Sequence, residues 1–127
     1  DLIARLNLSK GSIFKIVGAV REALKEDGFT QNKEEGALVF PLELLIASAQ
    51  HGFFYVDSSF SLTKIENGGF WAIGSGDSYA FGAAAALCDA DPEIEPQRRV
   101  SLAVIAAMRY SLTCGGKVKI CVVKRDG

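Results

Sequence analysis

The stretch FWAIGSGDSYAFG, residues 70–82, decides how this chain folds. Its apolar start, residues 70–73, predicts a buried strand, and Gly74-Ser75-Gly76 predicts a tight turn. A helix should follow from Ser78 to about Leu87. Its small residues, Gly82 and the alanines at 83–86, would allow another segment to pack very closely against it. The stretch therefore predicts a buried strand that delivers a glycine loop to the N-terminus of a helix.

Such a loop invites comparison with phosphate-binding motifs, since the free N–H groups of a helix N-terminus attract anions. A dinucleotide fingerprint needs glycine where this chain has Tyr79, and a P-loop needs a Gly-Lys-Ser/Thr run, which is absent. Two interpretations of the spacing stay open: a plain tight turn, or a small nucleotide-binding α/β module that uses Gly74 to Gly76.

Upstream, the pattern predicts a helix followed by a hairpin. Ser12 can cap a helix that ends near Asp27, with Gly28 as its stop. Residues 29–36 are polar and predict a loop. The apolar runs at 38–50 and 53–57, joined by His51-Gly52, predict two strands with a tight turn, and residues 58–65 can add another strand.

Downstream, the chain should continue with a second helix and a last strand. Residues 89–93 form an acidic loop, and a helix is expected from Glu95 or Pro96 to about Thr113. Gly115-Gly116 should turn the chain into a strand at 117–124. This order does not alternate regularly between strand and helix, so it favours antiparallel sheets layered with helices, an α+β fold.

Length and charge exclude several classes of protein. The 127 residues fit one domain, and 14 basic residues against 15 acidic ones give a net charge of −1. A nucleic-acid-binding surface normally shows an excess of Lys and Arg, so no nucleic acid partner is expected. The longest apolar runs fall well short of the roughly 20 residues that a membrane span needs, so no membrane association is expected.

Cysteine and histidine usage narrows the chemistry. The 3 cysteines form no CxxC pair and cannot all pair with one another, which favours a reduced, cytoplasmic setting. The single histidine, His51, excludes a histidine-based triad and a multi-histidine metal site. His51, Asp57 and Asp77 could form an acid–base pair, but solvated turn residues explain them more simply. The chain opens at Asp1 on an apolar periodic run, so we expect a truncation upstream.

Taken together, several motifs resemble the proteasome β subunits and the bacterial HslV peptidase. Residues 72–76 and 79–82 are similar to the strand, GSG turn and helix start of that family. Residues 52–57 (GFFYVD) resemble its G-x-Y-Y-x-D strand, and residues 114–118 (CGGKV) its Ser-Gly-Gly turn and next strand. The motifs occur in the family's order and spacing over about residues 13–127.

The resemblance implies a four-layer αββα sandwich of the N-terminal-nucleophile (Ntn) hydrolase class, truncated at its N-terminus, with residues 1–127 as a partial domain. In that family an N-terminal threonine attacks the peptide carbonyl, and its own α-amino group acts as the base. Asp1 has neither hydroxyl nor thiol and cannot be this nucleophile. The resemblance therefore places the nucleophile upstream, and we expect the 127-residue chain alone to be inactive.

The resemblance carries a supporting shell onto this sequence. Ser75 matches the GSG serine, whose hydroxyl lies near the nucleophile's amine, and Ser111 and Cys114 match an Asp and a Ser that orient that amine. HslV-type enzymes also lack the carboxylate at the position of Ser111, which favours that branch; a helix-capping Ser111 and a structural Cys114 are the alternatives. Family members often bind a cation through carbonyls, here those of Met108, Ser111 and Cys114, and no other cofactor is implied.

The resemblance also implies a function and partners. It indicates a subunit of a self-compartmentalising threonine-type peptidase that works in a ring of like subunits and hydrolyses peptides supplied by an ATP-dependent unfoldase. A catalytically silent, ring-building scaffold subunit is the first alternative. The nucleotide-binding module is the second.

Overall fold

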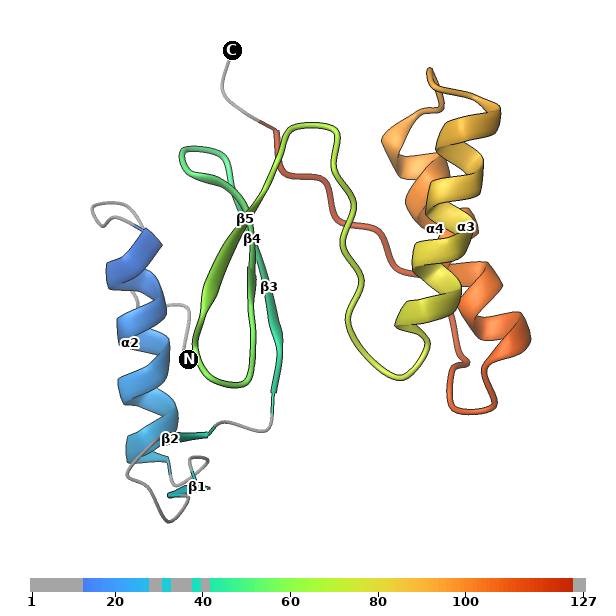
Figure 1. The fold of residues 1–127 in the computed structure, drawn as a ribbon. Coiled ribbons are helices and arrows are strands. Elements are labelled where there is room, and N and C mark those ends of the chain that lie inside the picture. The colour runs from blue at the N-terminus through green and yellow to red at the C-terminus, as the bar shows by residue number, and fades with distance from the viewer. Residues whose placement is uncertain (1–12, 28–30, 33–37, 40–41, 125–127) are drawn as a thin grey trace. The chain divides into compact units, whose positions relative to one another are not determined.

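The computed structural model describes residues 13–27, 31–32, 38–39 and 42–124 (Figure 1). They form two compact units, the first ending at Lys64 and the second comprising Ile65–Lys124. The mixture of helices and a small antiparallel sheet agrees with the α+β class predicted from the sequence. Among these residues no helix is long and apolar enough to cross a membrane.

The first unit begins with helix α2, Ile13–Glu26. Its buried residues recur at helical spacing, so they form one apolar stripe: Ile13, Ile16, Val17, Val20 and Ala23. This helix was predicted, although its expected cap and stop, Ser12 and Gly28, lie outside the described residues.

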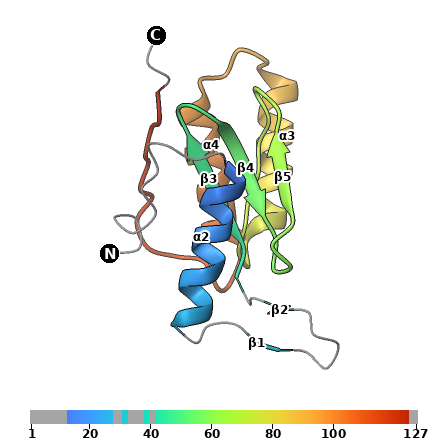
Figure 2. The ribbon, with the colours of Figure 1, turned by 90° about the vertical axis from the view of Figure 1, so that its left-hand side faces the viewer.

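A three-stranded sheet with the order β3-β4-β5 belongs to the first unit, except for Ile65, the last residue of β5. Strands β3 (Leu44–Ser48) and β4 (Gly52–Val56) pair antiparallel, with Leu44 opposite Val56 and Ser48 opposite Gly52; β5 is Leu62–Ile65. Helix α2 lies along one face of the sheet (Figure 2), where Ile13 and Ile16 contact the buried Phe54. Gly52 has φ +103°, which suits glycine at the turn, and the predicted hairpin is confirmed.

The prediction of a loop at residues 29–36 is wrong in one place. Residues Gln31–Asn32 form strand β1, which pairs antiparallel with β2, Leu38–Val39. The side chains of such a short polar segment carry no strand signal, and the pairing is made by backbone hydrogen bonds to a partner several residues away.

The second unit is built on two packed helices, α3 (Asp77–Ala90) and α4 (Pro96–Tyr110), which lie side by side (Figure 1). Its core is a cluster of buried alanines, Ala80 and Ala84 on α3 against Ala103 and Ala107 on α4. Close packing at Ala84 was predicted from the alanine run, but Gly82 is exposed, so its predicted part in the packing is wrong. Pro96 stands at the start of α4, where its missing N–H costs nothing.

Two predicted strands of this unit, residues 70–73 and 117–124, are wrong, since neither has strand structure in the described part of the chain. Instead, the aromatic rings of Phe70 and Trp71 each make a T-shaped contact with Phe81 of α3, at centroid distances of 5.9 Å and 5.3 Å. A strand needs a hydrogen-bonded neighbour, and side-chain periodicity does not reveal whether one is present.

The Arg99 side chain binds the segment that leads to the GSG loop to the helices. Its Nε donates to the Ala84 carbonyl at 3.0 Å, its Nη1 donates to the Gly68 carbonyl at 3.3 Å, and its guanidinium lies 5.3 Å from the centroid of the Phe70 ring. These contacts tie residues 68–70 to both helices and so fix the approach to Ser75.

Candidate functional site

The GSG loop brings Ser75 to the start of α3 through two glycines with different tasks. Gly74 has φ +104°, a left-handed conformation that glycine adopts without steric cost, and its carbonyl accepts the Asp77 N–H at 3.1 Å. Gly76 is buried, and a Cβ there would lie 2.6 Å from Cys114 Sγ and 2.9 Å from Ala107 Cβ. Only glycine therefore lets the two segments come this close, while Ser75 itself stays exposed.

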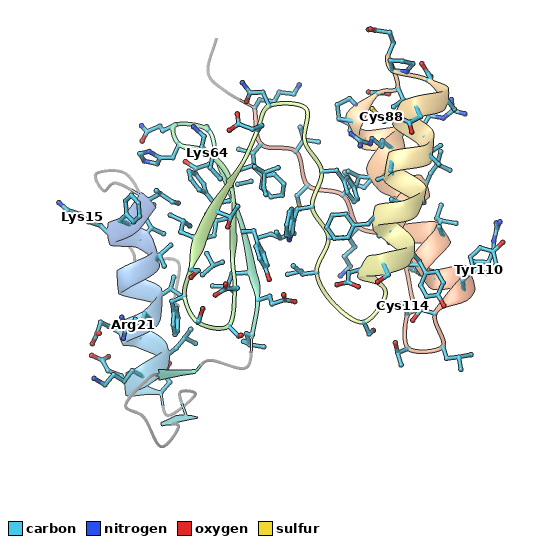
Figure 3. All side chains as sticks on the ribbon, in the orientation of Figure 1. Lys15, Arg21, Lys64, Cys88, Tyr110 and Cys114 are labelled. Atoms are coloured by element: carbon cyan, nitrogen blue, oxygen red, sulfur yellow. The ribbon has the colours of Figure 1, made fainter. Side chains whose placement is uncertain are left out.

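The segment after α4 supplies the other half of the site. Helix α4 ends at Tyr110, three residues earlier than predicted, and Ser111 adopts extended backbone angles while its N–H still donates to Ala107. The Ser111 carbonyl then accepts the Cys114 N–H at 3.3 Å, which closes a turn. Figure 3 shows Cys114 close to Tyr110, at the end of the helix pair opposite Cys88.

Four side chains from these two segments form a hydroxyl cluster: Ser75, Ser111, Thr113 and Cys114. Thr113 Oγ1 donates to Ser75 Oγ at 2.6 Å, and Ser111 Oγ lies 3.1 Å from Thr113 Oγ1. Ser75 Oγ lies 3.7 Å from Cys114 Sγ. The cluster thus joins residues that are 38 and 39 positions apart in the chain.

All three supporting residues expected from the sequence lie in this cluster, although their catalytic roles stay predictions. Thr113 was not foreseen, because the resemblance assigned no role to its position. A signal was available: a threonine between Ser111 and Cys114, just past a helix end, can bond to a neighbouring loop as readily as they can.

The cluster changes the acidity of its thiol. Hydrogen bonding by the Ser111 side chain, and then by Ser75, lowers the pKa of Cys114 below the ordinary thiol value of 9.0; partial burial opposes this, and Thr113 adds to it. Hydrogen bonds from hydroxyl groups stabilise the thiolate more than the thiol. Cys114 should therefore be more reactive than an ordinary exposed cysteine.

The carbonyls expected to hold a cation belong to the same helix end. Met108 lies within the last turn of α4, and Ser111 and Cys114 follow it at three-residue intervals. Terminal carbonyls lack helical partners and suit hard cations, but that of Ser111 already accepts one hydrogen bond. The described residues contain no cluster of His, Cys, Asp or Glu that could hold a metal, so the cation stays a prediction about carbonyls alone.

The geometry gives the nucleotide-binding alternative little support. Asp77 places a carboxylate in the first turn of α3, where a phosphate would bind, and its N–H is already bonded to Gly74. Like charges repel at this position, so the helix start is poorly suited to an anion.

The alternative acid–base residues behave as turn residues. Asp57 Oδ1 accepts the N–H groups of Ser59 and Ser61 at 2.9 Å and 3.0 Å and the Ser59 hydroxyl at 2.7 Å. The Ser59 hydroxyl is the main cause that lowers the pKa of Asp57. His51 donates its backbone N–H to Ser48 Oγ at 3.2 Å, within the β3–β4 turn, and its Nε2 atom is buried without a hydrogen-bond partner.

Comparison with solved structures identifies similar folds. The chain resembles Thiobacillus denitrificans BPH, a bacterial proteasome homologue, with a TM-score of 0.70 and 25% identity, and the same protein in complex with epoxomicin, with a TM-score of 0.67 and 26% identity. Each match covers 92% of this chain and 63% of the other, so the chain spans less than two thirds of the proteins it resembles. No family model and no curated protein matches. The likeness supports the proteasome-like family and a proteasome-type peptidase fold.

Proposed function

We propose that this chain is part of a proteasome-type threonine peptidase subunit that hydrolyses peptide bonds inside a ring. The observation that carries the proposal is the hydroxyl cluster, in which the GSG loop and the segment after α4 meet around Ser75. The likeness to a bacterial proteasome homologue, which was solved in complex with the proteasome inhibitor epoxomicin, supports the same assignment.

In this proposal the described residues support a nucleophile that they do not themselves supply. An N-terminal threonine would attack the carbonyl while its α-amino group, which titrates near pH 8, takes up the proton. Ser75 would bond to that amine, and Ser111 and Cys114 would help to orient it. The neutral cluster lacks a carboxylate to hold the ammonium form, so the amine should act as a base at neutral pH.

Several finer features belong to the same proposal. They are the four-layer αββα sandwich, a ring of like or related subunits, peptides delivered by an ATP-dependent unfoldase, an HslV-type branch, a cation at the carbonyls of Met108, Ser111 and Cys114, and a cytoplasmic location.

The test uses the full-length protein that contains this chain. It should hydrolyse a fluorogenic peptide, lose that activity when treated with epoxomicin, and show a mature N-terminal threonine by mass spectrometry. A ring without activity and without such a threonine would establish the scaffold instead. Saturable binding of a nucleotide would establish the nucleotide-binding module.

A further inference from the structure

The direction of each hydrogen bond in the hydroxyl cluster follows from counting protons. A threonine hydroxyl has one proton to donate and two lone pairs to accept with. The proton of Thr113 goes to Ser75 Oγ at 2.6 Å. The 3.1 Å contact between Thr113 Oγ1 and Ser111 Oγ therefore requires Ser111 to donate and Thr113 to accept.

Ser111 is placed to make that donation. Its Oγ accepts the backbone N–H of Thr113 at 3.4 Å, and its single proton can go to Thr113 Oγ1 or to Cys114 Sγ, whose pKa it lowers. The half-buried Ser111 is also anchored by its backbone at the end of α4, where its N–H bonds to the Ala107 carbonyl. With either acceptor for Ser111, the proton of Thr113 goes to Ser75.

This direction determines what Ser75 can do. Its hydroxyl is exposed on a glycine turn, where an unbonded serine would sample several rotamers. Because Thr113 occupies one of its lone pairs, the proton of Ser75 must point elsewhere, and Cys114 Sγ lies within reach at 3.7 Å. One lone pair of Ser75 then remains to accept an N–H from outside the cluster.

We propose that Thr113 is a positioning residue, which holds Ser75 Oγ in one rotamer so that its free lone pair accepts an N–H of the nucleophile's α-amino group. This inference rests on the proposed function and deepens it. Thr113 is the donor to Ser75 Oγ at 2.6 Å, and the other printed contact of that hydroxyl, with Cys114 Sγ, is longer at 3.7 Å. Thr113 itself is exposed, so removing its hydroxyl should cost little packing.

The experiment compares Thr113→Val, which keeps the shape and loses the hydroxyl, with Thr113→Ser, which keeps the hydroxyl, in the full-length protein. We expect Thr113→Val to lower kcat by about tenfold with KM within about twofold, because a transition-state interaction is lost. Thr113→Ser should restore most of kcat. Thr63→Val, at an exposed threonine of β5, is the matched control and should leave kcat and KM unchanged.

Crystal structures of the parent and both variants give a readout that does not depend on activity. Ser75 Oγ should keep its rotamer in Thr113→Ser and leave it in Thr113→Val. An unchanged Ser75 rotamer in Thr113→Val overturns the inference, and so does a loss of activity that only follows a lower unfolding midpoint. If the parent is active and Thr113→Val keeps full kcat, the positioning role fails while the proposed function stands. If the parent is inactive, the proposed function fails and the rotamers alone decide the hydrogen-bonding role of Thr113.

Discussion

Each unit contains a network of hydrogen bonds between short polar side chains. The two networks use similar residue types but differ in how far apart their residues lie in the sequence. In the first unit, Asp57 accepts three hydrogen bonds from Ser59 and Ser61, all within four positions along the chain. In the second, Ser75 bonds to Thr113 and Cys114 across 38 and 39 positions. A local network forms wherever a turn supplies the residues, whereas a long-range one exists only if the fold brings two loops together.

The two networks also stabilise different things. The Asp57 network holds residues 57–61 in a turn that includes Phe60 at φ 64°, an unusual angle for a non-glycine residue, beneath the Arg21 guanidinium at 5.5 Å. The hydroxyl cluster lies over closely packed helices and leaves Ser75 exposed. The first network therefore supports a backbone conformation, and the second presents a chemical group to solvent.

The largest effect is expected when the GSG loop can no longer approach Ala107 and Cys114 closely, an approach that only the second network needs. Gly76→Ala should lower the free energy of unfolding by roughly 1 to 3 kcal/mol, because the new Cβ would overlap Cys114 Sγ and Ala107 Cβ. Chemical denaturation measures this change. Gly82→Ala is the control: beyond its chain neighbours and the backbone of its own helix, no atom lies within 4 Å of its added Cβ, and alanine should stabilise the middle of α3 by about 0.5 to 1 kcal/mol. Equal stability of Gly76→Ala and the parent would contradict the close approach.

A second effect tests whether the cluster acts on its thiol. The pKa of Cys114 is lowered chiefly by Ser111, so Ser111→Ala should raise it toward the ordinary value of 9.0. Because the thiolate is the reactive form, the pH profile of Cys114 alkylation should move to higher pH in this variant. Peptide mapping follows the exposed Cys121 in the same sample as a reference. If the pH profiles of Cys114 alkylation coincide in parent and variant, the cluster has no influence on the thiol.

The smallest effect concerns the local network. The folded-state pKa of Asp57 lies below 3.8, so the carboxylate contributes stability at pH values above 3.8 and loses that contribution as the pH falls through its folded-state pKa. Asp57→Asn should therefore be less stable than the parent at neutral pH, and the difference should shrink in acid. Thermal unfolding between neutral pH and pH 3 measures it, with Asp89→Asn, an exposed carboxylate of α3, as the control. A difference that does not vary with pH would contradict the role of the Asp57 charge.

The sequence predicted the helices and the hairpin because their signals are local. The stripe from Ile13 to Ala23, the alanine run of α3 and Pro96 before α4 each act within one element. The strands predicted at 70–73 and 117–124 failed because strand structure depends on a partner segment that side-chain pattern does not identify. The short β1–β2 pair was missed for the converse reason, since its polar residues carry no strand signal.

The site divides in the same way. Ser75, Ser111 and Cys114 were found through the spacing of a resembled motif, and the structure places them together. Thr113 was missed because its role depends on a hydrogen bond to Ser75, 38 positions away, which no local sequence pattern encodes. Predicting the end of α4 three residues too late also hid the turn that frees Thr113 from the helix.

One paired measurement tests the central claim that the hydroxyl cluster is a functional site and the Asp57 network a structural one. In the full-length protein, kcat and the thermal midpoint are compared for Ser75→Ala and Ser59→Ala. Ser75→Ala should lose roughly 1 to 3 kcal/mol of transition-state stabilisation, about tenfold to hundredfold in kcat, with its midpoint nearly unchanged. Ser59→Ala should keep its kcat and lower its midpoint slightly. An unchanged kcat in Ser75→Ala, or a loss that only follows a lower midpoint, would contradict the claim.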